Sequence, residues 1–438
     1  MLDELYSDHL RTQRQRMDDA LAASRFEAVA IYAGTARMQF LDDQPYPFKV
    51  NPHFRVWTPL ADPLDCWILY RPGQRLKLIF WQPVDYWHKP PSAPAGYWTS
   101  HFDIEVIREA LDAKSHVAGL SDCAFIGEWR EEFAQWGFKQ VNPKNLLDRL
   151  HYPRAIKTPY EVECMRRASR AGAVGHRAAE AAFREGASEY GIHLEYLRAT
   201  QHSENELPYP SIVALNENCG VLHYQHQERT APTQRYSFLI DAGAQFAGYA
   251  SDITRSYSWA DDEFDTLIQE MHKLQLSLCS QVRDGVDYAS IHVDTHMRIG
   301  NLLHDVGLIS SSGSDALESG LTSIFFPHGI GHLLGLQVHD VAGFMNSPDG
   351  TTKDKPADHP YLRLTRTLSP GFVVTIEPGI YFIDLLLDKA RGSALSNQIN
   401  WSAVKRFEPC GGIRIEDDVL CTSGEPENLT RDAFAACI

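Results

Sequence analysis

The sequence predicts an α/β domain followed by a larger α+β domain. Its length of 438 residues suits two or three domains at roughly 150 residues each. Short apolar runs of strand length are frequent in the first third of the chain, whereas long helical patterns alternate with strands beyond it. A helix-start signal at Thr158 marks the change between the two patterns. We therefore expect domains at residues 1–155 and 156–438.

The first domain should open on a helix and contain a small sheet. The first 23 residues, MLDELYSDHLRTQRQRMDDALAA, form a charged amphipathic pattern without the apolar stretch of a secretory signal. Apolar runs then predict strands at residues 28–32, 67–70 and 76–81. Between the first two strands, the prolines at 45 and 47 exclude a regular element, so residues 42–48 should form an extended loop that carries Asp42 and Asp43.

The second domain should begin with a capped helix. Thr158 can accept the first backbone hydrogen bonds, Pro159 suits the first helical turn, and Glu161 occupies the reciprocal position of a capping box. Further helices are expected at residues 189–201, about 263–283 and about 287–305, and strands at residues 237–241, 371–376 and 412–416. This mixture is typical of an α+β domain.

Composition excludes several classes of partner. The formal net charge of −16 opposes binding to nucleic acid or to an anionic membrane surface. No apolar run approaches the roughly 18 to 20 residues that a bilayer span requires. The eight cysteines are scattered without a CxxC pair, which argues against a zinc ribbon or a disulfide framework. We expect a cytoplasmic protein.

Two aspartates follow one another across a predicted hairpin. Asp241 ends an apolar strand at a glycine turn, and Asp252 lies eleven residues later. A hairpin here would place both carboxylates on one side. Taken alone, an aspartate before a glycine is usually only a turn residue.

Three histidines crowd a glycine-rich segment. His328 and His332 lie in the stretch FPHGIGHLLG, and His339 follows seven residues later. The glycines are spaced GxGxxxG, and no Lys-Ser or Lys-Thr pair follows, so neither the dinucleotide nor the P-loop phosphate mechanism applies. Glycines at these positions let the backbone and a metal ion approach closely.

Two glutamates end predicted strands. Glu377 follows the run VVTI and Glu416 follows the run GIRI. An acid at the end of a buried strand is costly unless it is paired or bound to a cation. For Glu416 an exposed turn stays open as an alternative, because Asp417 and Asp418 continue the acidic run.

Together these residues offer two aspartates, two glutamates and one histidine, a donor set suited to hard cations. It favours Mn²⁺ over structural zinc while leaving Co²⁺, Zn²⁺ and Fe²⁺ open. Four carboxylates also balance the charge of two divalent ions. Two ions about 3.5 to 4 Å apart could share a bridging hydroxide, which is the nucleophile of a hydrolase.

The order of these motifs resembles the pita-bread metalloenzymes, a family that includes creatinase, methionine aminopeptidase, aminopeptidase P and prolidase. The stretches FLDDQPYPFKVNP, PVDYWHK, TQHSENELPY and INWSAVKRFEPCGGIRIED are further similar to the bacterial Xaa-Pro dipeptidases, or prolidases, including those called organophosphorus acid anhydrolases. The resemblance covers nearly the whole chain. It implies an N-terminal α/β domain and a C-terminal pita-bread domain that holds the metal ions between curved sheets.

The resemblance also assigns expected roles. The implied metal ligands are Asp241, Asp252, His332, Glu377 and Glu416, with Asp252 and Glu416 bridging two ions. Glu377 is in addition the implied general acid and base. The residues implied to line the cleft are His223, His328 and His339, with Arg414 behind the carboxylates. Arg363, Asp43 and Tyr209 are the expected substrate contacts, Arg363 for the terminal carboxylate and Asp43 for the terminal ammonium group.

The expected reaction is hydrolysis of Xaa-Pro dipeptides by the bridging hydroxide, with a possible side activity on organophosphate triesters. An Xaa-Pro bond is a tertiary amide without an N–H group, so recognition of an extended backbone fails there and the metal ions replace it. The resemblance implies a homodimer, because the N-terminal loop of one subunit approaches its partner's active site in such relatives. Two alternatives stay open: an aminopeptidase P that removes one residue from longer Xaa-Pro peptides, and a metal-free peptide-binding module.

Overall fold

The structure is a computed structural model that describes residues 2–437. The chain divides into two compact units. The first contains the chain up to Arg154 together with Thr158–Val162 and Ser347–Thr351, and the second contains the remainder. The domain boundary between residues 155 and 156 stays a prediction. The two units alternate along the chain there, since residues 155–157 belong to the second unit and Thr158–Val162 to the first.

The first unit is built on a six-stranded mixed sheet with the strand order β4-β3-β2-β1-β5-β6. Its strands are β1 (Ala28–Tyr32), β2 (Trp67–Tyr70), β3 (Leu76–Trp81), β4 (Phe102–Ile107), β5 (Cys123–Ile126) and β6 (Gln140–Val141). The three strands predicted from apolar runs are confirmed with the expected bounds. β1 pairs antiparallel with β2 and parallel with β5, so this unit is an α/β domain.

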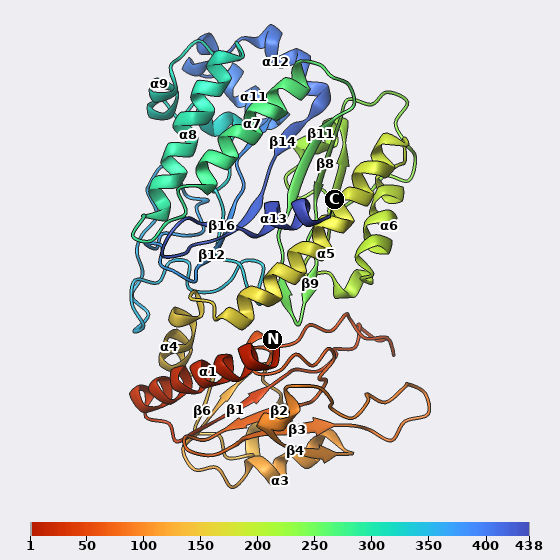
Figure 1. Ribbon diagram of the computed structural model, residues 1–438, viewed down its shortest axis with the longest axis vertical. Coiled ribbons are helices and arrows are strands. Elements are labelled where there is room, and N and C mark those ends of the chain that lie inside the picture. The colour runs from red at the N-terminus through yellow and green to blue at the C-terminus, as the bar shows by residue number, and fades with distance from the viewer. Residues whose placement is uncertain (1, 438) are drawn as a thin grey trace. The chain divides into compact units, whose positions relative to one another are not determined.

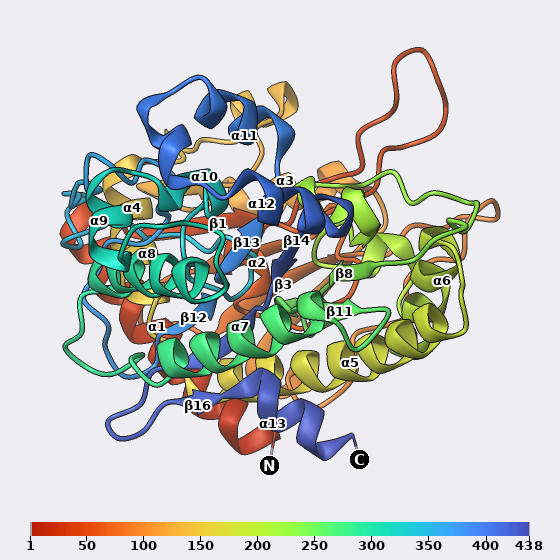
Figure 2. The ribbon, with the colours of Figure 1, turned by 90° about the horizontal axis from the view of Figure 1, so that it is seen from above.

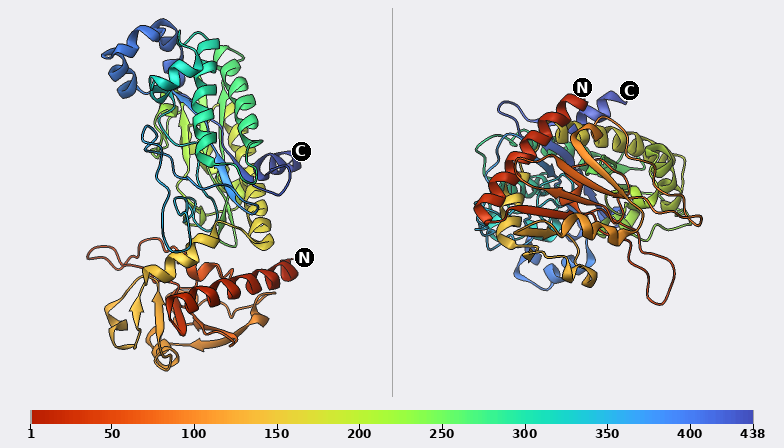
Figure 3. Two further views of the ribbon diagram at one scale, coloured as in Figure 1. Left: turned by 90° about the vertical axis from the view of Figure 1, so that its left-hand side faces the viewer. Right: turned by 90° about the horizontal axis from the view of Figure 1, so that it is seen from below.

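Helices and aromatic side chains cover this sheet. The helices are α1 (Leu2–Ser24), α2 (Pro52–Arg55), α3 (Lys114–Val117) and α4 (Lys144–Arg154). The expected opening helix is confirmed as α1, which lies along the sheet with α4 beside it (Figures 1 and 3). On the sheet, Tyr32, Trp67 and Phe125 pack against Phe133 and Trp136 from the segment between β5 and β6.

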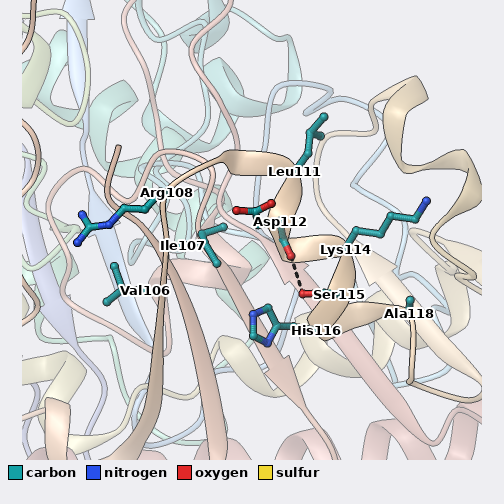
Figure 4. A pocket seen from close by; sticks show the side chains of 9 residues that line it. All are labelled: Val106, Ile107, Arg108, Leu111, Asp112, Lys114, Ser115, His116 and Ala118. Atoms are coloured by element: carbon teal, nitrogen blue, oxygen red, sulfur yellow. Dashed lines mark hydrogen bonds between the residues drawn. The ribbon is translucent and has the colours of Figure 1, made fainter. Parts of the chain in front are cut away.

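An open hollow lies on the first unit at the end of β4 and the helical segment that follows it (Figure 4). The Ser115 hydroxyl donates a hydrogen bond of 2.9 Å to the carbonyl oxygen of Asp112 there. None of the site residues expected from the sequence lines this hollow. We therefore assign it no part in the chemistry.

The second unit contains several short antiparallel sheets, some of which are joined by isolated bridges. Its strands are β7 (Ile212–Leu215), β8 (Ser237–Asp241), β9 (Gln245–Phe246), β10 (Tyr249–Ala250), β11 (Thr254–Ser258), β12 (Val373–Ile376), β13 (Gly379–Tyr381), β14 (Gly412–Arg414), β15 (Asp417–Leu420) and β16 (Glu427–Asn428). The sheets have the orders β11-β8-β7, β12-β15-β16, β13-β14 and β9-β10. A bridge between Thr254 and Glu416 joins the first of them to the chain between β14 and β15.

Long helices run along these strands. Figure 2 shows α5 (Pro159–Arg184) and α7 (Glu263–Cys279) on one side of β8 and β11. α8 (Tyr288–Asp305) packs against α7. The remaining helices are α6 (Glu189–Thr200), α9 (Gly313–Glu318), α10 (Thr322–Phe325), α11 (Asp384–Arg391), α12 (Trp401–Phe407) and α13 (Leu429–Ala436). The capping box at the start of α5 is confirmed, since the Thr158 amide donates to the Glu161 carboxylate over 2.8 Å.

Two predicted elements end earlier than expected. α7 stops at Cys279 rather than near residue 283, because the chain turns there toward Gly285, whose φ of 81° is left-handed. The strand predicted at residues 412–416 ends at Arg414. The chain resumes as β15 at Asp417, and Glu416 lies in the break. Within the described helices, none has the length and apolar character needed to cross a bilayer.

A buried ion pair holds β11 to β15. Arg255 Nη2 lies 2.7 Å from Asp417 Oδ1, and both side chains are almost fully buried. The same guanidinium donates to the carbonyl oxygens of Thr254 and Glu416. Arg431 contacts the second oxygen of Asp417, so its charge is shared between two arginines. These cations hold the pKa of Asp417 well below its usual range in spite of burial.

Replacing Arg255 should strongly destabilise the second unit. Arg255→Ala leaves part of the buried Asp417 charge uncompensated, and we expect the free energy of unfolding to fall by about 3 kcal/mol. The shift of the urea midpoint measures this loss. The control is Arg406→Ala, which removes an exposed pair with Glu263 and should change stability by less than about 1 kcal/mol. Equal midpoints for the two variants would contradict the assignment.

Candidate metal centre

Asp241 and Asp252 are brought together by the hairpin between β8 and β11. The register pairs Asp241 with Thr254, and the chain between them returns through the short β9–β10 hairpin. Gly243 makes this return possible, because a Cβ at that position would collide with the carbonyl oxygen of Ser251. The Asp252 amide donates to Asp418 on β15, which fixes the backbone behind the carboxylate. Both acids end on the same side of the strands.

Backbone contacts around His332 fix the position of its side chain. The preceding Gly331 has a φ of 150° and leaves no room for a Cβ beside the Thr375 carbonyl oxygen. The His332 amide donates to the Thr375 hydroxyl over 3.0 Å. Ring atom Nδ1 lies 3.0 Å from the Leu333 carbonyl oxygen and therefore carries the proton. Nε2 faces the acids and is the atom that an ion would bind.

Glu377 and Glu416 face each other across a break in a strand pair. β12 pairs with β15 and β13 pairs with β14, and the two ladders share one register across the gap. Continuing that register places Glu377 opposite Glu416. At the gap their amides donate outward instead, Glu377 to the Ile330 carbonyl oxygen over 2.9 Å and Glu416 to the Thr254 carbonyl oxygen over 3.0 Å. The two glutamates are thereby tied to the segments that carry His332 and Asp252.

The five side chains converge. Ligand atoms of Asp252, His332 and Glu416 all lie within 4.8 Å of one another, and all three residues are buried. His332 Nε2 lies 3.4 Å from Asp252 Oδ2 and 3.6 Å from Glu377 Oε1. Asp241 lies close enough to act on them: burial first, and then repulsion from Asp252, raises the pKa of Asp241, and Arg414 opposes this change. The structure therefore brings together every residue of the expected ligand set.

The electrostatics of this cluster favour the binding of cations. Burial first, and then repulsion among the carboxylates, raises the pKa of Glu377 to about 7 and that of Glu416 well above its usual range. Arg414 offsets part of this, and its Nη2 lies 2.7 Å from Asp241 Oδ2. Asp241 Oδ1 is buried without a hydrogen-bond partner. An orphaned carboxylate oxygen among buried acids fits a divalent ion.

The other histidines surround the cluster. His328 Nε2 lies 2.8 Å from the Tyr381 hydroxyl, and its Nδ1 lies 3.7 Å from Glu377 Oε2. The ring of His339 lies 4.3 Å from that of His332, centroid to centroid. Burial is the main cause that lowers the pKa of His328 to about 3 and that of His339 to about 4. His223 is exposed and lies close enough to contribute to the lowered pKa values of both rings.

The expected substrate contacts are placed less uniformly. The Tyr209 hydroxyl donates a hydrogen bond of 2.5 Å to Asp252 Oδ1, so Tyr209 contacts one of the expected metal ligands. Arg363 is exposed, and its charge lowers the pKa of His339, which puts it beside the cluster. Asp43 is exposed on the first unit and accepts a hydrogen bond from Gln44. Its role stays a prediction.

Sequence reasoning missed the residues that hold the carboxylates. The Thr254 hydroxyl donates to Glu416 over 2.7 Å, and the Thr375 hydroxyl lies 3.4 Å from Glu377. Each threonine lies two positions from a predicted ligand in sequence, a spacing at which strand side chains share a face. The exposed-turn alternative for Glu416 is wrong, because Glu416, Asp417 and Asp418 are at most 2% exposed.

Comparison with known proteins places this centre in a family. Residues 163–423, which contain all five clustered donors, match the metallopeptidase family M24. The chain belongs to metallopeptidase family M24. Its residues 4–152 match the family described as the N-terminal domain of Xaa-Pro dipeptidase. Membership of a metallopeptidase family makes this M24 chain a metal-dependent hydrolase with a pita-bread catalytic domain, and it implies divalent ions at the centre.

Relatives cover the full length of this M24 chain. An Xaa-Pro dipeptidase of Xanthomonas campestris pv. campestris (strain 8004) is 51% identical over 437 residues, 99% of each chain. One of Stenotrophomonas maltophilia (strain K279a) is 51% identical over 434 residues, 99% of this chain and 98% of the relative.

Solved structures show the same two-domain fold. Aminopeptidase PepP of Pseudomonas aeruginosa is 21% identical with a TM-score of 0.71, and 98% of each chain is covered. Proline aminopeptidase P II of Yersinia pestis is also 21% identical, with a TM-score of 0.70 over 99% of each chain. At this identity the likeness concerns the fold alone.

Ion binding should compete with protons at the carboxylates. Because the pKa of Glu377 is raised to about 7 in the ion-free site, its proton stabilises the ion-free fold below that pH, and that stabilisation is lost as the pH rises through 7. Bound cations replace the proton, so the gain in Tm on adding Mn²⁺ should grow between pH 5 and pH 7.5. Thermal melts with and without Mn²⁺ measure this. A gain that is constant across this range would contradict the assignment.

Proposed function

We propose that this chain hydrolyses Xaa-Pro dipeptides with two divalent metal ions. The proposed ligands are Asp241, Asp252, His332, Glu377 and Glu416. The observation that carries the proposal is the buried cluster of Asp252, His332 and Glu416, whose ligand atoms lie within 4.8 Å of one another. Glu377 lies 3.6 Å from His332, and Asp241 adds a buried oxygen without a hydrogen-bond partner. The relatives named Xaa-Pro dipeptidase at 51% identity support the choice of substrate.

The donor set fits the ions well. Asp252 and Glu416 lie together with His332 in the buried cluster and are the proposed bridging ligands. Arg414 contacts Oδ2 of Asp241, and Oδ1 has no hydrogen-bond partner. Two divalent ions held by these residues would polarise the scissile carbonyl group and would supply a hydroxide as the nucleophile. Oxygen donors with one imidazole favour Mn²⁺, and Co²⁺, Zn²⁺ and Fe²⁺ suit the same set.

The chain's own residues move the proton and hold the substrate. Glu377 can take up a proton near neutral pH, and it is the proposed carrier of a proton to the departing proline nitrogen. His328 and His339 stay neutral there, because their pKa values are lowered to about 3 and about 4. Neutral His339 is the proposed hydrogen-bond donor to the tetrahedral oxyanion or to the substrate carboxylate. In His328 the single proton lies on Nδ1, 2.8 Å from the Gly329 carbonyl oxygen, so Nε2 accepts from the Tyr381 hydroxyl, and His328 is proposed to line the cleft through that tyrosine.

The two charged ends of a dipeptide need charged partners. The planar guanidinium of Arg363 is exposed beside His339 and is the proposed clamp for the terminal carboxylate. Asp43 is the proposed partner of the terminal ammonium group. Tyr209 is proposed to contact substrate from its position on Asp252. A substrate gripped at both ends needs no backbone N–H at the scissile bond.

The alternatives from the sequence are weaker. An aminopeptidase P shares this fold, but residues 4–152 match the N-terminal domain of Xaa-Pro dipeptidase, which favours the dipeptidase. A metal-free binding module would lack part of the ligand set, and here all five donors are present and close together.

Three further properties complete the proposal. A homodimer is proposed. Sedimentation of the purified protein tests it, and a monomer with full activity would contradict it.

Side activity on organophosphate triesters is proposed because a tetrahedral phosphoryl centre resembles the intermediate of amide hydrolysis. Hydrolysis of a chromogenic triester tests it. A cytoplasmic location remains a prediction from the sequence.

Substrate length decides between the two peptidases. We expect rapid hydrolysis of an Xaa-Pro dipeptide, little hydrolysis of an Xaa-Pro tripeptide, and near-complete loss of activity on chelation with recovery on adding Mn²⁺. Glu416→Gln should reproduce the loss and bind less metal, because it removes a proposed bridging carboxylate. Faster cleavage of the tripeptide would instead support the aminopeptidase.

Arg363 should act on substrate binding. Because a charged hydrogen bond is worth about 1.5–3 kcal/mol, Arg363→Ala should raise KM for an Xaa-Pro dipeptide by about tenfold or more with a smaller effect on kcat. Steady-state kinetics measure both. Arg406→Ala, an exposed arginine of the same unit that contacts Glu263, is the matched control and should leave KM unchanged. An unchanged KM in Arg363→Ala would remove the clamp.

A further inference from the structure

Three histidines of the second unit form a cluster separate from the five clustered donors. His292 and His296 lie one turn apart on α8, and His359 comes from the segment that precedes Arg363. One ring nitrogen of each lies within 4.8 Å of the others. The three ring centroids are 4.5 to 4.7 Å apart. We call this set the histidine triad.

The triad contains a buried nitrogen that needs a partner. His292 is only 2% exposed, and its Nδ1 has no hydrogen-bond partner. In His296, Nδ1 lies 2.8 Å from the Thr322 hydroxyl, so Nε2 is the atom left for another contact. A buried polar atom without a partner costs about 1–3 kcal/mol. Something other than protein is therefore expected to reach His292.

The rings are neutral, which is the form that binds metal. Burial, followed by repulsion from the other rings, strongly lowers the pKa of His292 and lowers that of His296 to about 3. The pKa of His359 is lowered as well, and the nearby Asp358 opposes that change. Lone pairs are thus available near neutral pH, and Asp358 supplies a compensating negative charge.

Packing alone does not explain the triad. The Phe326 ring contacts His292 and His296 with centroids 5.8 and 4.9 Å away, so apolar rings would fill this space without an orphaned nitrogen. Histidines at positions i and i+4 of a helix present their rings on one face, a spacing that zinc sites use. A third imidazole from another segment completes a three-histidine donor set.

We propose that the histidine triad binds one divalent ion of the Zn²⁺ class. Imidazole donors suit Zn²⁺, Ni²⁺ and Cu²⁺, whereas Mn²⁺ prefers oxygen donors. The site would therefore differ in selectivity from the centre built by the four carboxylates. Zn–N bonds of about 2.0–2.1 Å require the rings to close in slightly, and His359 is the half-buried member that can move.

Binding would connect the triad to the catalytic centre. The Phe326 ring lies between them, 4.9 Å from His296 and 4.8 Å from His328. The backbone of Leu362, three residues after His359, lies against Gly329, since a Cβ there would come within 3.1 Å of Leu362 Cα. An ion on His359 would thus fix the segment that carries Arg363 against the loop that carries His328 and His332.

Zinc content tests the proposal in the full-length protein. After incubation with excess Zn²⁺ and gel filtration, elemental analysis should find one ion more per chain in the wild type than in His359→Gln. The matched control is His304→Gln, an exposed histidine at the end of α8, which should keep the wild-type content. Equal zinc in the wild type and His359→Gln would overturn the proposal.

A second variant separates binding from packing. His292→Phe keeps an aromatic ring and removes the orphaned nitrogen, so it should fold with a Tm at or above that of the wild type in chelator. It should also bind one zinc ion fewer per chain than the wild type. Asp252→Asn keeps the triad but lacks one carboxylate of the metal centre, so the gain in Tm that zinc still produces in that variant measures the triad. The zinc-induced gain in Tm of His292→Phe should be smaller than that of the wild type by this amount. A His292→Phe variant that retains the full zinc content would show that the triad only packs.

Discussion

The burial of four carboxylates around one imidazole is the constraint on which the second unit depends. Acids at this depth repel one another, and desolvation opposes their charged forms. The fold counters this with Arg414 on Asp241, with threonine hydroxyls on Glu377 and Glu416, and with an arginine pair on Asp417 behind the site. The charge that remains is what divalent ions neutralise. The same arrangement that opposes folding without ions therefore creates affinity for them.

Backbone geometry does most of the positioning. The interrupted pairing of residues 373–381 with residues 412–420 directs the amides of Glu377 and Glu416 away from each other, toward the loop before His332 and the strand after Asp252. Each ligand is thus located by a hydrogen bond to a neighbour of another ligand. Glycines at 243 and 331 admit the close backbone contacts that this network needs.

The sequence predicted most elements and singled out the five candidate donors that the structure brings close together, because strand-ending acids and glycine-flanked histidines leave a strong local pattern; their role as metal ligands stays a proposal. It failed where the decisive partner is far along the chain. Asp417 looks like part of a solvated acidic turn until Arg255, 162 residues earlier, is seen beside it. The histidine triad was missed for the same reason, since His359 lies far from α8 in sequence. The early end of α7 depends on a turn whose signal, Gly285, is local but weak.

The shared register of the two interrupted ladders limits how such a chain can diversify. Because Glu377 and Glu416 stand opposite each other in one continuous alignment, inserting or deleting a single residue in either flanking segment would turn that segment's donor to the wrong face and separate it from the donor opposite. The connection between those segments, residues 382–411, carries none of the five donors and is free of this constraint. Changes in chain length should therefore accumulate in that connection, while the flanking segments keep an invariant length.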